Sequence, residues 1–230
     1  MPKATDLLQL NKLACVKGER LLFSGLSCEI PSGSLVRVTG ANGAGKTSLL
    51  RIIAGLSEPA AGDIVWNGKN SREARQEFLQ DVLYLGHASA IKDALFPAEN
   101  LMASCALQGE RFSASEVSVI LQQLGLGERL QVESLSLSAG QRRRIALARL
   151  WLTQRSLWLL DEPFNALDSR AIEQLSEKIS DHLKAGGVCL YTTHQPVDIV
   201  AVQQSSIHLD SFCPPIHTQA GPSASNRSLA

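Results

Sequence analysis

The amino-acid sequence predicts an α/β fold in which strands and helices alternate around a largely parallel sheet. Short apolar segments recur along the chain, and helical hydrophobic patterns follow several of them. The expected strands are residues 35–40, 63–68, 82–86, 156–161, 187–194 and 205–210. The expected helices are residues 45–54, 97–107, 114–124, 141–153 and 168–184. In the opening 60-odd residues, strand and turn signals such as "IPSGS" dominate and predict an antiparallel β subdomain.

The middle and the end of the chain differ from this core. Between about residues 88 and 140 the strand signal disappears and short helices dominate, which predicts a helical subdomain inserted in the core. Residues 211–230, "SFCPPIHTQAGPSASNRSLA", are rich in Pro, Ser and Ala, which predicts a disordered tail. We therefore expect a single domain over residues 1–210, followed by that tail.

Composition excludes several classes of protein. Hydrophobic residues make up 44% of the 230, enough for a sizeable core, so a wholly disordered chain is excluded. Lys plus Arg and Asp plus Glu both number 22, and this zero net charge argues against a nucleic-acid-binding protein. The five cysteines lack C-x-x-C spacing, so we expect neither a disulfide framework nor a zinc site, and a reducing cytosol is favoured. They are Cys15, Cys28, Cys105, Cys189 and Cys213.

The distribution of apolar residues indicates whether the chain carries a secretory signal or a membrane-spanning segment. The polar start "MPKATDLLQLNKLACVKGER" has none of the apolar stretch that is typical of a secretory signal. Apolar runs such as "LARLWLTQRSLWLL" are broken by arginines before they reach the length of about 18 residues that a bilayer requires. We therefore do not expect the chain to span a membrane by itself.

The segment "LVRVTGANGAGKTSLL" combines a phosphate-binding loop with the strand and helix that such a loop requires. It has the pattern Gly-x-x-x-x-Gly-Lys-Thr, and its backbone N–H groups are expected to close around nucleotide phosphates. Lys46 would add a point charge at the β- and γ-phosphates, and Thr47 would offer a hydroxyl to Mg²⁺. The loop residues expected to bind the nucleotide are Gly40, Ala41, Asn42, Gly43, Ala44 and Gly45.

A second motif, "SLWLLDEP", ends an apolar strand with two acids. Asp161 would hold Mg²⁺, and Glu162 is placed to orient and deprotonate the attacking water. An acidic pair after a strand is by itself more often a helix N-terminal cap. Together with the phosphate loop, the catalytic interpretation is favoured. The two motifs predict an ATPase or a GTPase, and the absence of the guanine-reading "NKxD" pattern favours ATP.

The start of the helix in "LSLSAGQRRRIALARL" has an unusual composition. Arg142, Arg143 and Arg144 crowd its first turn, where the helix dipole disfavours cations, and Gly140 sacrifices helix propensity. An anion bound to the free N–H groups of this helix start would explain both features. With a phosphate loop in the same chain, we expect that anion to be a nucleotide phosphate. The arginines would add positive potential there, although some of them could simply solvate the helix face.

Four further motifs make a resemblance to one family specific. "LSAGQ" (137–141), "WLLDEP" (158–163), "NALD" (165–168) and "TTHQ" (192–195) follow "GANGAGKT" in that order. Over about residues 5–210 the chain resembles ABC-type ATPases. The resemblance implies a P-loop NTPase core, an antiparallel β subdomain and a helical subdomain that carries the "LSAGQ" signature loop.

The resemblance also implies a site shared between two chains. In that family two copies pack head-to-tail, so the signature loop of one copy caps the γ-phosphate held by the phosphate loop of the other. On this basis Ser138, Gly140 and Gln141 would contact ATP across a homodimer. Asp168 would lie in the loop linking the two nucleotide sites, and His194 would reach the γ-phosphate.

Two positions depart from the family's common pattern. Most members carry a glutamine where this chain has His87, which could still hold a water near Mg²⁺ as part of the catalytic site, with a different pH dependence. Many members also stack the adenine on an aromatic residue upstream of the phosphate loop. Here that segment offers Lys17 or Arg20, and Phe23 is expected to be buried, so adenine selectivity is expected to be weak.

Further segments resemble one subfamily, the ATPase subunits of cytochrome c maturation haem exporters (CcmA-type). The matching residues are Gly86-His87, Ile91-Lys92 and Glu99-Asn100-Leu101. The resemblance implies a homodimer on the cytoplasmic face of the bacterial inner membrane, bound to integral membrane permease subunits. It would use ATP to release haem, or a haem-loaded chaperone complex, for cytochrome c assembly. Cys213 with His217 could form a haem-sensing pair, but a solvated linker is the favoured interpretation of that segment.

Three alternatives remain open. The first is the ATPase of another small exporter, with the same chemistry and a different cargo. The second is a soluble ABC-type switch, which is disfavoured because such proteins usually have two cassettes or a long coiled-coil insertion. The third is a catalytically inactive dimerisation module, against which Glu162 argues.

Overall fold

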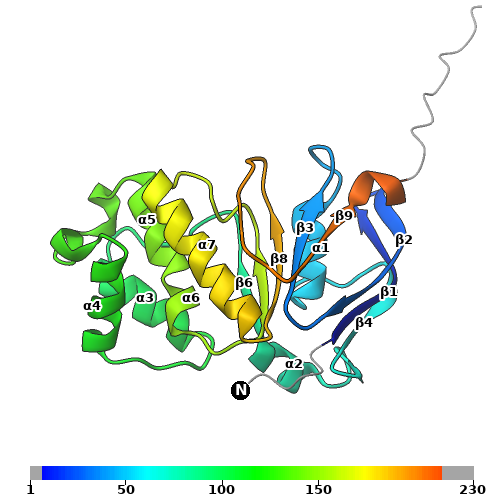
Figure 1. The fold of residues 1–230 in the computed structure, drawn as a ribbon, viewed down its shortest axis with the longest axis horizontal. Coiled ribbons are helices and arrows are strands. Elements are labelled where there is room, and N and C mark those ends of the chain that lie inside the picture. The colour runs from blue at the N-terminus through cyan, green and yellow to red at the C-terminus, as the bar shows by residue number, and fades with distance from the viewer. Residues whose placement is uncertain (1–6, 214–230) are drawn as a thin grey trace, which may run out of the picture.

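The computed structural model describes residues 7–213, which form two sheets and a helical lobe. In Figure 1 the antiparallel sheet and the helical lobe lie on opposite sides of a central parallel sheet. The strands are β1 (Leu7–Lys17), β2 (Arg20–Pro31), β3 (Ser34–Thr39), β4 (Ala61–Trp66), β5 (Lys69–Asn70), β6 (Val82–Leu85), β7 (Leu157–Leu160), β8 (Val188–Thr192) and β9 (Gln203–His208). The α-helices are α1 (Lys46–Ile53), α2 (Arg75–Asp81), α3 (Pro97–Ala106), α4 (Ala114–Gln123), α5 (Ala139–Leu147), α6 (Arg149–Leu152) and α7 (Ser169–Lys184).

The parallel sheet has the strand order β6-β7-β8-β3-β9. Every residue of β7 and β8 is buried, which explains their continuous apolar sequences, since strands covered on both faces lose the alternation of polar and apolar residues. The phosphate loop follows β3, and the acidic pair follows β7, with β8 between these two strands. Because parallel strands end at the same edge of a sheet, this order brings the two motifs together.

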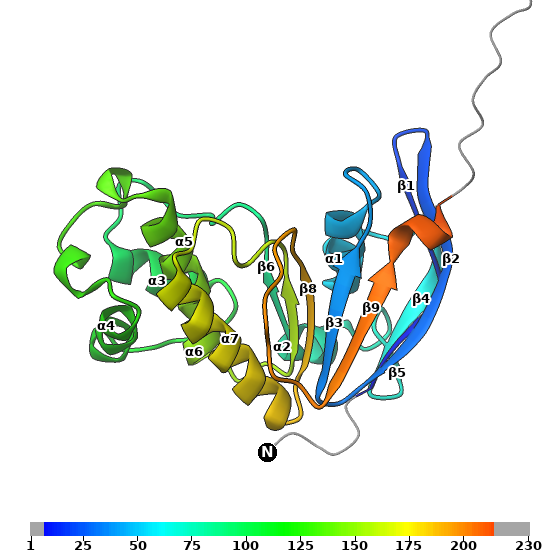
Figure 2. The ribbon, with the colours of Figure 1, turned by 45° about the horizontal axis from the view of Figure 1, so that its top comes forward.

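The antiparallel sheet has the order β2-β1-β4-β5 and confirms the predicted antiparallel flank. Long strands β1 and β2 form its centre and one edge, and Figure 2 shows them curving past the parallel sheet. The pairing of β1 with β4 shifts register between Asn11 and Ala14. At Gly62, beside this irregularity, a Cβ would lie 2.3 Å from the Asn11 carbonyl oxygen, so the close approach of the strands requires glycine.

The helical lobe comprises α3, α4, α5, α6 and two short 3₁₀ helices, Gly127–Arg129 and Ser134–Ser136. It has its own apolar cluster, in which Leu101, Leu121 and Ile145 are fully buried. The single helix expected over residues 141–153 is wrong in two respects. Helix α5 begins two residues earlier because Ser138 caps it, and a turn at Ala148 separates it from α6.

Helix α2 and the segment after β9 differ from the sequence expectation, and helix α7 agrees with it. Helix α2 was not predicted, since it is short and buries only Phe78. Helix α7 matches the predicted helix closely, with Asp168 as its N-cap. After β9, a 3₁₀ helix (Leu209–Phe212) brings Phe212 and Cys213 against the main core. The rest of the predicted tail, His217 included, lies outside the described residues. Over residues 7–213, no helix combines the length and apolarity needed to cross a bilayer.

Candidate nucleotide-binding site

The phosphate loop runs from the end of β3 to the first turn of α1. Its glycines Gly40, Gly43 and Gly45 all have positive φ, between 83° and 147°, which L side chains rarely adopt. Gly45 also lacks room for a side chain, because a Cβ there would lie 3.2 Å from the ring of Phe23. Among the described residues, no side chain caps the N-terminus of α1, so its first N–H groups remain available to an anion. The sequence prediction that Phe23 is buried is confirmed, since its exposure is 0%.

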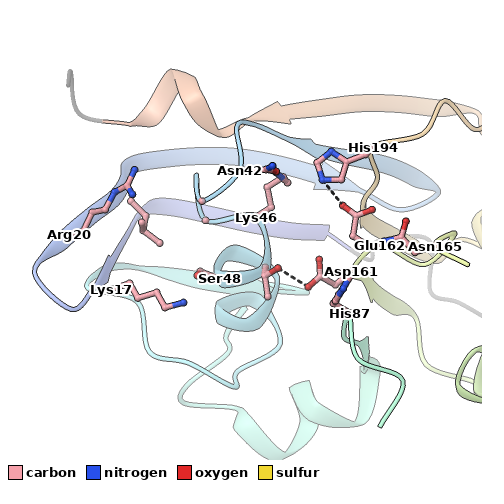
Figure 3. Close-up of a pocket in the computed structure, with 14 residues that line it drawn as sticks. Lys17, Arg20, Asn42, Lys46, Ser48, His87, Asp161, Glu162, Asn165 and His194 are labelled. Carbon is pink, nitrogen blue, oxygen red and sulfur yellow. Dashed lines mark hydrogen bonds and ion pairs between the residues drawn. The ribbon is translucent and has the colours of Figure 1, made fainter. Parts of the chain in front are cut away.

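The Lys46 side chain curls back over the loop. Its Nζ donates hydrogen bonds to the carbonyl oxygens of Gly40 at 2.8 Å and Ala41 at 3.2 Å. These bonds hold the ammonium above the loop that it belongs to. Figure 3 shows Lys46 beside Asn42 at the centre of a cavity.

Asp161, directly after β7, accepts hydrogen bonds through both carboxylate oxygens. Thr47 Oγ1 donates to Oδ2 and Thr192 Oγ1 donates to Oδ1, each at 2.8 Å. Asp161 is only 2% exposed, so these two hydroxyls satisfy a charge that burial would otherwise penalise. The sheet order supplies both partners, since Thr47 begins α1 after β3 and Thr192 ends β8.

Glu162 combines a buried carboxylate with a strained backbone. Its φ is 51°, a conformation that costs a non-glycine residue about 1–3 kcal/mol. Its N–H donates to Thr192 Oγ1 at 2.8 Å, and its Oε1 lies 3.3 Å from Nε2 of the exposed His194. Its Oε2 is buried without a hydrogen-bond partner among the described residues. A buried carboxylate oxygen left without a donor is expensive, and it marks a position where a ligand or water can bind.

Arg143 accounts for the strained turn after β7. Its exposure is 4%, and its guanidinium donates to the carbonyls of Asp161 at 3.0 Å, Glu162 at 2.9 Å and Gly86 at 2.9 Å. Burial lowers the pKa of Arg143, and the neighbouring charges of Asp161 and Glu162 oppose that effect. Arg143 therefore ties the acidic pair to the end of β6. From the sequence, this side chain was expected either near a phosphate or in solvent. Instead it is buried against backbone carbonyls of its own chain.

The other two arginines of the run also have partners in their own chain. Arg142 forms an ion pair with Asp93 at 2.8 Å, and Arg144 pairs with Asp168. Asp168 caps α7 by accepting a hydrogen bond from the Ala171 N–H at 2.9 Å. That bond is the main reason why the pKa of Asp168 lies below its usual value, and Arg144 contributes to the same shift. The arginine run is thus explained by contacts within the chain.

The phosphate loop, the acidic pair and the side chains of His87 and His194 line one cavity of about 540 Å³, a volume within the range of small-molecule sites. Figure 3 shows Lys17 and Arg20 at one end of it, and Asp161, Glu162, His87 and His194 at the other. The lining residues are Lys17, Arg20, Leu22, Asn42, Gly43, Gly45, Lys46, Thr47, Ser48, His87, Asp161, Glu162, Asn165 and His194.

The signature residues do not join this cavity. Ser138 and Gln141 bond to each other at the start of α5: Ser138 Oγ accepts from the Gln141 N–H, and Gln141 Oε1 accepts from the Ser138 N–H. Gly140 packs against the loop that follows Glu162, where a Cβ would lie 2.6 Å from the Ala166 carbonyl oxygen. That contact gives an intrachain reason for this glycine. Neither these residues nor Asp168 line the cavity within residues 7–213.

Several site residues were not singled out from the sequence. Ser48 and Asn165 line the cavity, and Thr192 holds both acids. Ser48 directly follows Thr47 of the phosphate loop, so adjacency was an available signal. Asn165 and Thr192 begin the motifs "NALD" and "TTHQ", but neither was given a role there. The structural role of Arg143 could not be predicted from the sequence, because the carbonyls that it binds lie in loops distant in sequence.

Comparison with known proteins assigns the family. The ABC transporter family model matches residues 23–165, which is more than half of the chain. The cytochrome c biogenesis ATP-binding export protein CcmA of Aromatoleum aromaticum is 50% identical over 196 residues, covering 85% of this chain and 92% of that protein. The chain belongs to the CcmA-type ABC transporter ATPases. The CcmA protein of Escherichia coli K12 is 42% identical over 193 residues, covering 84% of this chain and 91% of that protein.

Solved structures agree on the fold. A putative ABC transporter ATP-binding protein from Pyrococcus furiosus superposes with a TM-score of 0.74 at 22% identity, covering 90% of this chain and all of that one. A dimeric ATP-binding cassette bound to ADP and Pi gives a TM-score of 0.68 at 20% identity, covering 82% and 88%. The predicted fold class is therefore confirmed, and the chain is the ATP-binding subunit of a cytochrome c biogenesis ABC exporter.

Proposed function

We propose that this subunit hydrolyses ATP in the 540 Å³ cavity, with Glu162 as general base. The observation that carries the proposal is the unpartnered Oε2 of Glu162, buried in the wall of the cavity that the phosphate loop also lines. In this arrangement the triphosphate lies on the loop and on Lys46, and the nucleoside extends toward Lys17 and Arg20. Water bound at Glu162 would then lie on the side of the γ-phosphate that faces the acidic pair.

The donor set fits Mg²⁺. Thr47 Oγ1 and the Asp161 carboxylate are oxygen ligands held 2.8 Å apart, and Mg²⁺ prefers oxygen ligands supplied by one or two side chains together with substrate phosphates. Thr47 and Asp161 would hold the ion, and Mg²⁺ would neutralise charge on the phosphate oxygens. The Thr47–Asp161 hydrogen bond would be replaced when the ion binds.

The histidines would act on either side of Glu162. His194 Nε2 lies 3.3 Å from Glu162 Oε1 and its side chain is 60% exposed, so it can turn from the carboxylate toward a γ-phosphate. His87 lines the cavity, and its carbonyl accepts a hydrogen bond from Arg143 at 3.3 Å. We assign His87 to coupling, because its backbone is tied to the same guanidinium that holds the acidic pair.

The functional unit that we propose is a head-to-tail homodimer. Ser138, Gly140 and Gln141 do not line the cavity of their own chain, so they could contact a nucleotide there only from a second chain. In a homodimer the backbone N–H groups at the start of α5 would approach the γ-phosphate of the partner's nucleotide. Asp168, at the N-terminus of α7, would link the two sites. The dimeric cassette with ADP and Pi has the same fold, which supports this assembly.

The cellular role that we propose is haem export for cytochrome c maturation. The relatives at 42–50% identity are named as cytochrome c biogenesis export proteins. The dimer would bind integral membrane permease subunits at the cytoplasmic face of the bacterial inner membrane. ATP hydrolysis there would release haem or a haem-loaded chaperone complex to the periplasmic assembly pathway.

Covalent haem in the c-type cytochromes of the source cell tests this role. Lys46→Ala removes the cation that faces the triphosphate, so we expect ATP binding about 100-fold weaker. Haem-stained cytochromes should disappear while the apoproteins are still made. Lys184→Ala removes an exposed lysine of α7 and is the matched control, expected to behave as wild type.

The cytochrome readout tests the proposed haem cargo, and the ATP affinity tests the proposed phosphate site. Normal cytochromes with Lys46→Ala would remove haem from the proposal and leave the ATPase standing. Unchanged ATP affinity in the same variant would contradict the assignment of the phosphate site.

A further inference from the structure

The segment after β9 folds back onto the phosphate loop. In Figure 2 the 3₁₀ helix Leu209–Phe212 (orange) follows β9 and lies beside β2. From this helix Asp210 reaches the loop: its Oδ1 and Oδ2 each lie 3.1 Å from the backbone nitrogen of Ala41. Asp210 is not among the described residues that line the nucleotide cavity, so its contact with the loop is made outside that cavity.

The beginning of the loop is packed closely against this segment. A Cβ at Gly40 would lie 3.3 Å from Leu209 Cβ and 3.5 Å from Asp210 Oδ1. One residue earlier, Thr39 Oγ1 lies 2.7 Å from Nδ1 of His208, its register partner in the parallel pair of β3 and β9. Side-chain and backbone contacts therefore fix the entry of the loop at several successive residues.

The same segment also supports the far end of the loop. Cys213 Sγ donates a hydrogen bond to the Leu22 carbonyl at 3.0 Å. The side chains of Leu22 and Phe23 lie directly beneath Gly45, at 3.3 and 3.2 Å from the position of a Cβ there. Residues 209–213 thus brace both ends of the phosphate loop, one directly and one through β2.

The contacts of this segment meet at the two peptide groups that flank Ala41. In the Gly40–Ala41 peptide, the N–H of Ala41 is held by Asp210, and the Gly40 carbonyl accepts from Lys46 Nζ at 2.8 Å. In the Ala41–Asn42 peptide, the Ala41 carbonyl accepts from the Ala44 N–H at 3.1 Å and from Lys46 Nζ at 3.2 Å. The amides of Asn42 and Gly43 donate no hydrogen bond within the described part of the chain. Fixing the two peptides that flank Ala41 therefore limits the directions in which these free amides can point.

We propose that Asp210 is a positioning residue for ATP binding, which holds the Gly40–Ala41 peptide so that the following amides face the phosphates. This inference rests on the proposed nucleotide site. Preorganised donors bind an anion without the cost of ordering the loop at the moment of binding. The useful property of Asp210 is its acceptor oxygen, since a negative charge near phosphates is itself unfavourable. Asparagine, which keeps an acceptor oxygen and loses the charge, should therefore replace it.

Nucleotide titration of matched variants tests the proposal. For Asp210→Ala we expect an ATP Kd about tenfold higher and a KM raised in parallel, with kcat within about threefold of wild type. Asp210→Asn should bind ATP within about threefold of wild type, because its amide oxygen can accept the Ala41 N–H. Asp198→Ala, which removes an exposed aspartate from another loop, should leave every parameter unchanged. Wild-type affinity in Asp210→Ala, or equal losses in the alanine and asparagine variants, would overturn the proposal.

A second measurement uses the wild-type chain and needs no variant. Amide hydrogen exchange followed by NMR without nucleotide should be slower at Ala41 than at Asn42 and Gly43, because only the first amide is hydrogen-bonded. Equally fast exchange at all three would overturn the proposal even if Asp210→Ala failed to fold. A wild-type chain that binds no ATP would contradict the nucleotide site itself. Normal ATP binding that ignores Asp210 would contradict only the role given to that residue.

Discussion

The phosphate end and the signature end of the molecule differ in what they leave free. At the phosphate end, a buried oxygen of Glu162 and the loop amides of Asn42 and Gly43 make no hydrogen bond with any residue from 7 to 213. At the signature end, Ser138 and Gln141 satisfy each other. The difference shows that the first region can receive a ligand within one chain. The second has its polar side chains already paired and offers a new partner chiefly the backbone N–H groups of its helix start.

This comparison also explains the arginine run at the start of α5. Arg142, Arg143 and Arg144 are all bonded within their own chain, and Arg143 is almost completely buried. Arg143 and Arg144 tie the helical lobe to the core, and Arg142 pairs with Asp93 within the lobe. The anion-binding capacity of this helix start therefore rests on its backbone, and each of the following predictions tests one side of that contrast.

The largest effect is expected at the phosphate end, from Glu162→Gln. Loss of a general base should lower kcat for ATP hydrolysis about 100- to 10,000-fold, while ATP affinity stays close to wild type. Steady-state hydrolysis and a nucleotide titration measure the two quantities separately. Turnover at the wild-type rate would mean that another group activates the water.

At the signature end, Gly140→Ala should destabilise the fold and impair hydrolysis. The new Cβ would lie 2.6 Å from the Ala166 carbonyl, so the loop after Glu162 must shift, at a cost of about 1–3 kcal/mol. Thermal unfolding and kcat report the change, and ATP affinity should be retained. The control is Gly127→Ala, where a Cβ would meet only the Gln122 side chain at 3.3 Å. Equal behaviour of the two variants would argue against the close contact at Gly140.

A smaller effect is expected from Ser138→Ala, which removes a helix cap. The free energy of unfolding should fall by about 1 kcal/mol. Ser113→Ala removes the same kind of cap from α4 and should cost about as much. Only Ser138→Ala should also lower hydrolysis, since only that helix start is assigned to the nucleotide. If both variants hydrolysed ATP equally well, the role given to Ser138 would be lost.

The smallest effect on ATP binding is expected from His87→Ala. His87 lines the cavity, but its described hydrogen bond is made by its carbonyl, so the Kd for ATP should stay within about threefold of wild type. Cytochrome c maturation should nevertheless fail in the cell. A large loss of ATP affinity would move His87 from coupling to nucleotide binding.

The sequence predicted those parts of the fold and site that depend on local chemistry. The phosphate loop, the acids after β7 and helix α7 are contiguous patterns whose residues carry their own signals. The contacts of Arg143 and Asp210 could not be predicted, because they join segments that lie far apart in the sequence. In the sequence, Arg143 cannot be told apart from Arg142 and Arg144, because only the packing of the helix determines which of the three is buried.

The boundary of the folded region illustrates the same limit. The composition of residues 211–230 predicted a disordered tail. Within that segment, however, Phe212 packs on the core and Cys213 Sγ donates a hydrogen bond to the Leu22 carbonyl. Short polar and Pro-rich segments carry little local signal, so a folded turn at the edge of a core is decided by tertiary contacts. The start of α5 at Ser138 was also missed, because the three arginines after it are the more conspicuous feature of that segment.

The most direct test of the account is the mass of Glu162→Gln in solution, measured by light scattering with and without ATP. If the signature end of one chain completes the phosphate end of another, the mass should double when ATP is added and should stay at one chain with ADP. A protein that remains a single chain at saturating ATP would contradict the shared site.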